Sequence, residues 1–172
     1  KINYSSLGVG TTSHMGIEML KRATGVDVVH VPYKGTTEGM ADLLAGNVQM
    51  TLSTVSAMMP FIRKGSLRAI AASEKVRSPS LPDVPTLDES GVPGYDVMSW
   101  FGLGTRAGVP REIINRLASE ASRTMNLPEV QKRLTPSGLE IRYLGPDQFA
   151  EYIRLEYDKW GEIVRRVGIK PE

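Results

Sequence analysis

The residues Ser5-Ser6-Leu7-Gly8-Val9-Gly10-Thr11-Thr12-Ser13-His14 form the stretch that decides how the fold begins. Residues 2–5, just before its turn, are predicted to form a short strand. Residues 13–24 repeat apolar side chains at helical spacing, and Gly25 is placed to end that helix. A strand, a glycine-containing turn and a helix in this order indicate the first part of a βαβ unit.

The same alternation continues through the next fifty or so residues. Strands are predicted at residues 26–31, 48–52 and 67–72, and helices at residues 37–45 and 55–63. Strands that alternate with helices of about ten residues predict an α/β fold with a mainly parallel sheet.

The composition changes after residue 72. Residues 73–85 hold three prolines and are predicted to be an irregular connector. Thr86 and Glu89 then have the spacing of a capping box, which predicts a short helix. Residues 95–104 are strand-like but interrupted by glycine, so they are expected to cross between two lobes. The remaining elements are predicted as helices at 111–125 and 146–167, the second with an apolar stripe from Phe149 to Val167, and a strand at 139–143.

The composition excludes several classes of protein. Of 172 residues, 41% are apolar and 23% are charged, which is the balance of a globular rather than a disordered chain. No apolar run approaches the roughly 20 residues that cross a bilayer. A net charge of +2 is too small for a nucleic-acid footprint. The absence of cysteine excludes disulfides, cysteine-based zinc sites and cysteine catalysis.

The turn at residues 6–14 is the strongest candidate for a binding site. The first backbone N–H groups of a helix have no intrahelical partner and lie at the positive end of its dipole, so an anion is favoured there. Gly8 and Gly10 allow a ligand to approach the backbone closely. Hydroxyl groups come from four further residues, Ser6, Thr11, Thr12 and Ser13. Because one helix cap needs one hydroxyl, the cluster favours anion binding over a simple turn.

Two more polar turns are expected at the same edge of the sheet. The turn at residues 31–37 follows a strand, opens a helix and contributes Lys34, Gly35 and Thr36. Taken alone, Lys34 fits a solvated lysine better than a ligand-binding residue. Ser53 follows the third strand. Because the carboxyl ends of parallel strands meet at one edge, where open α/β sheets bind ligands, the three turns are predicted to form one site.

Other chemistries find less support. A dinucleotide site would need a third glycine where Ser13 stands. A small hydrolase or transferase that uses Ser13 or Ser6 with His14 stays open as an alternative, although no G-x-S-x-G turn is present. His30, near the end of an apolar strand, fits a hydrogen-bonded core residue better than a base. Two isolated histidines do not make a metal site, so no catalytic residue, metal or cofactor is predicted.

These turns resemble those of a known family. Ser6-Leu7-Gly8-Val9-Gly10-Thr11-Thr12-Ser13-His14 resembles the S-x-G-x-G-T-x-x-H loop of the Bug, or TctC-like, extracytoplasmic solute receptors, and Val31-Pro32-Tyr33-Lys34-Gly35 resembles their V-P-Y-K-G loop. Further family motifs are matched by Asp42-Leu43-Leu44-Ala45-Gly46, Arg77-Ser78-Pro79, Leu81-Pro82-Asp83-Val84-Pro85-Thr86 and Ser99-Trp100-Phe101-Gly102-Leu103. One departure lies near Ser53, where many relatives carry an acidic residue.

The resemblance implies a periplasmic binding protein of the type II class, an α/β fold whose mainly parallel sheet has helices on both faces. Residues 1–99 would form the second lobe and residues 100–172 the returning segment that completes the first. The ligand would be a small carboxylate, and the intact receptor would deliver it to the membrane subunits of a tripartite tricarboxylate transporter. The predicted ligand-binding residues are Ser6, Gly8, Gly10, Thr11, Thr12, His14, Lys34, Gly35, Thr36 and Ser53.

The start of the chain, Lys1-Ile2-Asn3, leads to the expectation of a processed protein or a fragment. Family members are longer at the N-terminus, and that part would supply most of the first lobe. The apolar stripes at residues 111–125 and 146–167 then need another surface to cover. A homodimer through residues 111–172 or a missing N-terminal fragment is expected to provide it. A non-binding, oligomerising fragment is therefore a third alternative.

Overall fold

The computed structural model describes residues 1–168, in two compact units. The first unit comprises residues 1–99 and the chain from Gly161 onward, and the second comprises residues 100–160. Residues 169–172, the end of the predicted returning segment, lie outside the described residues, as does the side chain of Val167 in the predicted apolar stripe. Each unit is described by itself.

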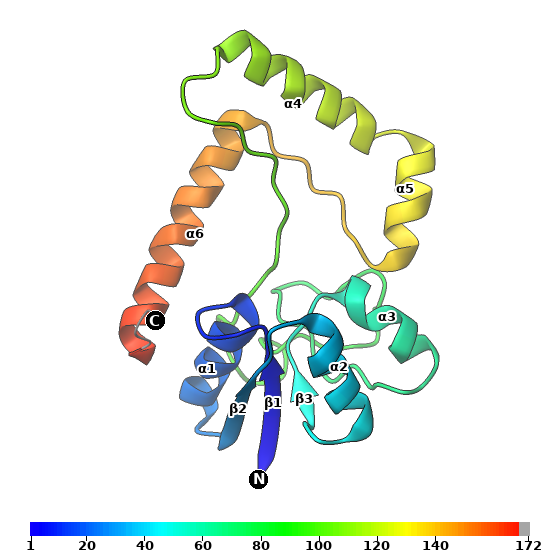
Figure 1. The fold of residues 1–172 in the computed structure, drawn as a ribbon, viewed down its shortest axis with the longest axis vertical. Helices are drawn as coiled ribbons and strands as arrows, with labels where there is room; N and C mark the ends of the chain where they lie inside the picture. Colours follow the sequence, from blue (N-terminus) through cyan, green and yellow to red (C-terminus); the bar gives the residue numbers. More distant parts are fainter. Residues whose placement is uncertain (169–172) are drawn as a thin grey trace. The chain divides into compact units, whose positions relative to one another are not determined.

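The first unit is built on a three-stranded parallel sheet in the order β2-β1-β3 (Figure 1). The strands are β1 at Ile2–Ser6, β2 at Val28–Pro32 and β3 at Met50–Thr51. Ser5 in the central strand pairs with Val31 on one side and with Thr51 on the other. The parallel sheet is confirmed, although β3 is shorter than the predicted strand at 48–52.

Helices cover both faces of this sheet. They are α1 at Thr12–Thr24, α2 at Thr36–Ala45 and α3 at Val55–Arg63. Tyr4 packs with Ile17 of α1, whereas a Cβ placed on Gly39 of α2 would lie 3.6 Å from the Ser5 side chain. Tyr4 and Ser5 are consecutive in β1 and point to opposite faces, so α1 and α2 lie on opposite sides of the sheet. This confirms the predicted arrangement.

The predicted strand at residues 67–72 is wrong. Only Ala72 makes a parallel bridge, with Thr86, and the Ile70 side chain is 75% exposed. An apolar run becomes a strand only where a neighbouring strand can pair with it, and this run has none beyond that bridge. Residues 95–104 likewise form no ladder, but Tyr95 is buried and donates its hydroxyl to the Gly16 carbonyl of α1 at 2.8 Å.

The predicted capping box is present but opens no helix. The Glu89 N–H donates to the Thr86 hydroxyl at 3.0 Å, and the Thr86 N–H donates to the Glu89 carboxylate at 2.8 Å. The chain continues as a hydrogen-bonded turn. Pro93 follows within one helical turn of the box, and the residue before a proline disfavours the helical conformation.

The second unit is helical. It contains α4 at Arg111–Met125, α5 at Pro128–Leu134, a 3₁₀ turn at Thr135–Ser137 and most of α6 at Pro146–Val167. The helices α4 and α6 are confirmed, and α5 was not predicted, although Pro128 stands at its favourable first position. The predicted strand at 139–143 is wrong, and Tyr143 there donates its hydroxyl to the Ala118 carbonyl of α4 at 2.8 Å. No helix among residues 1–168 is long and apolar enough to cross a membrane.

Candidate functional site

Three loops lie at the carboxyl edge of the β2-β1-β3 sheet, each between a strand and the N-terminus of a helix. They are residues 7–11 between β1 and α1, residues 33–35 between β2 and α2, and residues 52–54 between β3 and α3. The register brings them together, because Ser6 at the end of β1 pairs with Pro32 at the end of β2, and Ser5 pairs with Thr51. All ten predicted ligand-binding residues lie in or directly beside these loops, apart from His14, which is in the first turn of α1.

Most hydroxyls of the first loop build the loop itself. Thr11 is the N-cap of α1: its Oγ1 accepts from the His14 N–H at 3.4 Å and donates to the Gly8 carbonyl at 2.7 Å. The Ser13 hydroxyl lies 3.1 Å from the Thr11 hydroxyl. Thr12, by contrast, has a hydroxyl with no partner among residues 1–168. The sequence pattern suggested four free hydroxyl donors at this turn. The structure leaves fewer, because most of these hydroxyls already have partners within the protein.

Ser6 and Gly8 are also committed within the protein. Ser6 is only 5% exposed, and its Oγ accepts from the Gly8 N–H at 3.1 Å. The same Oγ lies 2.5 Å from Nε2 of His30 on β2. This contact joins the first loop to the neighbouring strand and confirms that His30 is hydrogen-bonded. Its side chain is only partly buried, so the expectation of a core position is wrong.

His14 faces the interior rather than the loop's outer surface. Its side chain is 8% exposed, and its ring lies 4.3 Å from the ring of His30, measured between centroids. Its Nδ1 accepts a hydrogen bond from the Gly10 N–H at 3.2 Å. Burial lowers the pKa of both histidines below the usual range, since the charged form is poorly solvated there. The sequence pattern predicted neither the contact between these two tilted rings nor the Ser6–His30 contact.

Apart from the Thr12 hydroxyl, the donors that remain at the first loop and the start of α1 are backbone groups. Among residues 1–168, the N–H groups of Val9, Thr12 and Ser13 have no hydrogen-bond acceptor. They belong to the first loop and the first turn of α1, where the helix dipole favours negative charge. The chemistry that this arrangement supports is the capture of a small anion by backbone donors.

The second loop repeats this feature. In α2, Gly35 is the N-cap without a side-chain bond, which leaves the N–H groups of Thr36 and Thr37 without acceptors in the described structure. Lys34 and Ser53 are exposed, and neither side chain has a hydrogen-bond or ion-pair partner among residues 1–168. The loop at 33–35 is fixed by Tyr33, whose N–H donates to the Ser6 carbonyl at 2.9 Å and whose hydroxyl donates to Asp42 at 2.6 Å.

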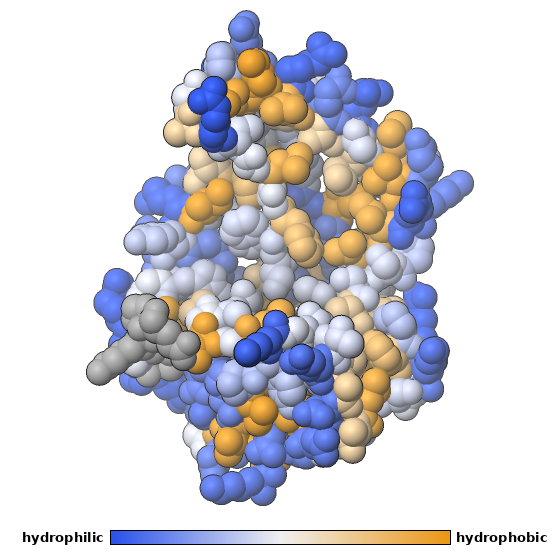
Figure 2. All heavy atoms as spheres, in the orientation of Figure 1, coloured by the Kyte–Doolittle hydropathy of each residue, from blue (hydrophilic) through white to orange (hydrophobic). Residues whose placement is uncertain are grey.

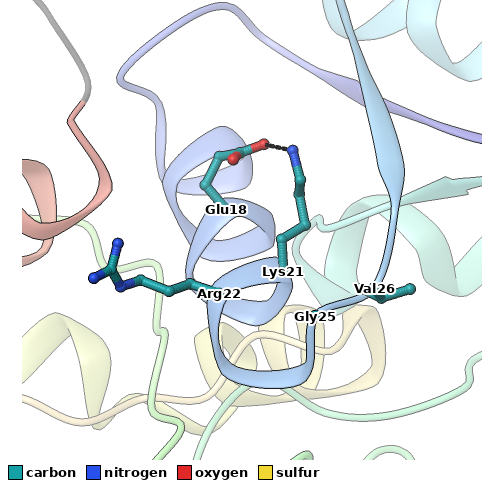
Figure 3. A pocket seen from close by; sticks show the side chains of 5 residues that line it. All are labelled: Glu18, Lys21, Arg22, Gly25 and Val26. Atoms are coloured by element: carbon teal, nitrogen blue, oxygen red, sulfur yellow. Dashed lines mark hydrogen bonds and ion pairs between the residues drawn. The ribbon is translucent and has the colours of Figure 1, made fainter.

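A separate hollow of about 270 Å³ lies at the other end of α1 (Figure 3). Glu18, Lys21 and Arg22 line it, and Lys21 forms an ion pair with Glu18 at 2.8 Å. Gly25, the C-cap of the helix, closes its rim. Because the helix C-terminus carries partial negative charge, this hollow lacks the free N–H donors of the loop edge, and it is not the candidate anion site.

The sequence matches a family of known proteins over almost its whole length. The family model described as TctC, tripartite tricarboxylate transporter family receptor, matches residues 1–169. A UPF0065 protein from the clcB-clcD intergenic region of Pseudomonas knackmussii is 33% identical over 158 residues, which cover 91% of this chain and 94% of that protein. A UPF0065 protein from the tcbD-tcbE intergenic region of Pseudomonas sp. strain P51 is 31% identical over 95% of this chain and 49% of its own length.

Solved structures show the same fold. Rpa4515 of R. palustris with adipate has 31% sequence identity and a TM-score of 0.92, over 100% of this chain and 57% of that one. MatC from Rhodopseudomonas palustris with bound malate has 30% identity and a TM-score of 0.80, over 95% of this chain and 56% of that one. The periplasmic binding protein BugD has 30% identity and a TM-score of 0.86, over 99% of this chain and 58% of that one. The chain thus spans little more than half of these structures and about half of several curated relatives.

Proposed function

Because this chain belongs to the tripartite tricarboxylate transporter receptor family, we propose that it captures a small carboxylate at the carboxyl edge of the β2-β1-β3 sheet. The observation that carries the proposal is the set of backbone donors without acceptors among residues 1–168, at Val9 in the first loop and at Thr12 and Ser13 in the first turn of α1. Two structural neighbours hold adipate and malate, both dicarboxylates. A carboxylate matches donors of this kind in charge and in hydrogen-bonding capacity.

The affinity expected of this edge by itself is low. A hydrogen bond to a charged group contributes about 1.5–3 kcal/mol net, and two or three of them must also offset the freedom that the ligand loses. Binding in roughly the millimolar range follows, equivalent to about −4 kcal/mol. We propose that residues 1–99 act as the second lobe of the receptor, and that residues 100–172 complete a first lobe that closes over the other end of the ligand.

The wider role follows from the family. Its members are receptors for tripartite tricarboxylate transporters, and BugD is a periplasmic binding protein. We propose that the intact protein works in the periplasm and hands its ligand to the membrane subunits of such a transporter. The apolar faces of α4 and α6 would pack on a second copy or on a further polypeptide segment.

A catalytic role is not favoured by the geometry. Ser6 lies against His30, not against His14, and its hydroxyl already accepts from the Gly8 N–H. The carboxylate of Glu18 is engaged by the Tyr4 hydroxyl and by Lys21, each at 2.8 Å, so it is not placed to orient a catalytic histidine. A binding function without covalent chemistry is therefore the proposal. A serine-reactive phosphonate is expected to leave the chain unlabelled, and labelling of Ser6 or Ser13 would contradict the proposal of a non-covalent binding function.

The test is titration of the chain with adipate and with malate, followed by ligand-observed nuclear magnetic resonance, which detects millimolar binding. The matched control is adipamide, which has the length of adipate but no charge. Both dicarboxylates are expected to bind and the diamide is not. If neither acid binds, or if the diamide binds equally well, anion capture at this edge is the wrong function for the chain.

A further inference from the structure

The two histidines of this sequence form a small polar cluster with the first loop. The ring of His14 lies between the loop and His30, and the ring of His30 stacks in turn on Tyr4 at 5.0 Å. One hydrogen bond ties each histidine to the loop region: the Gly10 N–H to Nδ1 of His14 at 3.2 Å, and the Ser6 hydroxyl to Nε2 of His30 at 2.5 Å. The cluster thus joins β1, α1 and β2 at the edge where the ligand is proposed to bind.

The two hydrogen bonds respond differently to a proton. The Gly10 N–H can only donate, so Nδ1 of His14 must carry a lone pair, and an imidazolium has none to offer. The Ser6 hydroxyl can donate or accept, so a protonated His30 can donate to Ser6 while Ser6 turns its own hydrogen to the Gly8 carbonyl, 3.2 Å away. Protonation of His14 therefore breaks a bond that holds the loop, whereas protonation of His30 only reverses one.

We propose that neutral His14 is a positioning residue for the carboxylate site: its Nδ1 holds Gly10 so that the 7–11 loop presents its free N–H groups, and protonation of His14 releases the loop. This inference rests on the proposed function for its effect on the ligand. The hydrogen bond itself does not depend on a ligand.

Burial, more than the nearby charges, favours the neutral form of both histidines. Burial lowers the pKa of His14 most, the carboxylate of Glu18 raises it, and the ammonium of Lys21 lowers it. For His30, burial is again first, followed by the lowering effect of His14. Tyr4 on β1 stays protonated, because burial and its bond to Glu18 raise its pKa far above the usual range. Loss of the Gly10 bond is therefore expected below about pH 6.5, the ordinary value for histidine.

Protonation of His14 has two opposite effects on carboxylate affinity, and the test measures which of them is larger. A protonated His14 adds positive charge near the loop, and charge alone would attract a carboxylate more strongly at low pH. Loss of the loop geometry would weaken binding instead. Because His14 is 8% exposed and its ring faces His30 rather than the free donors, we expect geometry to prevail.

Two variants separate these effects. His14→Asn keeps a carbonyl oxygen near the position of Nδ1 and does not titrate, whereas His14→Phe keeps a ring and removes the acceptor. His30→Gln serves as the matched control, because it removes the other histidine and leaves the Gly10 bond to His14 in place.

The first measurement needs no ligand. The amide signal of Gly10 is followed by nuclear magnetic resonance from about pH 7.5 to about pH 5, across the range in which histidine titrates. In the parent and in His30→Gln, the signal is expected to shift upfield and to exchange faster with water as the pH falls. In His14→Asn it is expected to stay constant. A parent signal that does not move, or one that moves equally in His14→Asn, overturns the positioning role.

The second measurement compares adipate affinity at the same pH values. The ratio of parent to His14→Asn affinity cancels the titration of adipate itself, and it is expected to fall about tenfold toward low pH, the equivalent of one hydrogen bond of about 1.4 kcal/mol. His14→Phe is expected to be weak at every pH, and His14→Asn to restore binding. A ratio that rises at low pH overturns the proposal, since it shows charge attraction to be dominant. If the Gly10 signal behaves as expected but adipate never binds, the proposed function is wrong, whereas the pH-dependent hydrogen bond between Gly10 and His14 stands.

Discussion

The unit built on residues 1–99 carries a core of its own, whereas residues 100–160 form helices without one. In the first unit Tyr4 and Tyr95 are 0% and 1% exposed. In the second, every apolar side chain is at least partly exposed, and Phe101 and Leu103 reach 79% and 83%. Figure 2 shows apolar residues exposed at the surface of this unit and also at the surface of the first.

The two units differ in the source of their stability. Helices form from local spacing, but most of their stability in proteins comes from burying an apolar face. The sheet of the first unit receives the faces of α1 and α2, so its loops are positioned within the described chain. The helices of the second unit bury little, and Trp100, Phe149 and Tyr152 pack edge to face or stacked at the side of an open hollow of about 400 Å³. This unit is expected to need a further surface.

Self-association is the largest expected effect of this contrast. Burial of one large apolar side chain contributes roughly 1.5–3 kcal/mol. The free energy available from burying several exposed ones is therefore comparable to the whole stability of a domain. We expect light scattering at low micromolar concentration to give a mass above that of one chain. Phe101→Ser with Leu103→Ser should lower it, whereas Ile70→Ser, at an exposed site in the first unit, should not. A monodisperse monomer with one cooperative melt would show that residues 100–160 are stable without a partner.

The cost of truncating a core side chain should differ sharply between the units. Tyr4→Ala removes a fully buried ring and is expected to lower the free energy of unfolding by about 3–5 kcal/mol. Phe149→Ala, in the half-buried cluster of the second unit, is expected to cost about 1–2 kcal/mol, since much of its ring already meets water. Urea unfolding measures both changes. Both tryptophans, Trp100 and Trp160, lie in residues 100–160, so their fluorescence follows that unit while circular dichroism follows both. Equal costs would contradict the comparison.

Two glycines of the first unit share a positive φ, but only one of them is expected to affect ligand binding. Gly10 and Gly25 have φ of 79° and 70°, and no atom lies within 4 Å of a Cβ added at either. Valine at either position should therefore cost about 1–2 kcal/mol of stability through backbone strain alone. Only Gly10→Val, which disturbs the first loop, is expected to weaken adipate binding by at least about tenfold in a titration followed by ligand-observed nuclear magnetic resonance. Equal affinity in Gly10→Val and Gly25→Val would remove the loop from the site.

The smallest expected effect belongs to Lys34. Its side chain is exposed, so it should act by long-range attraction that salt screens. Lys34→Ala is expected to weaken adipate binding by about threefold or less at low ionic strength, and by an undetectable amount in strong salt. A loss of more than about tenfold in strong salt would instead identify Lys34 as a direct partner of the ligand.

Local sequence determined much of the fold. The helices α1, α2, α3, α4 and α6 follow from apolar spacing, and glycines end α1 and α2 in the left-handed conformation that the other residues avoid. The alternation of these helices with β-branched runs was sufficient for the parallel sheet, and hence for three polar loops at one edge. The short helix α5 was missed because it has too few residues to show a period, although Pro128 marks its start.

Strand pairing and the partners of the site residues were decided by tertiary structure. Residues 67–72 and 139–143 have the composition of strands, but a strand exists only where another chain segment accepts its hydrogen bonds, and composition does not say where that segment lies. The hydroxyls in and beside the first loop looked like ligand donors, yet all but that of Thr12 have partners within the protein. His14 and His30, sixteen residues apart, meet only because parallel pairing sets β2 beside β1. The sequence by itself predicted an anion site at these loops; the fold decided which groups there remain without partners, because that depends on contacts between distant residues.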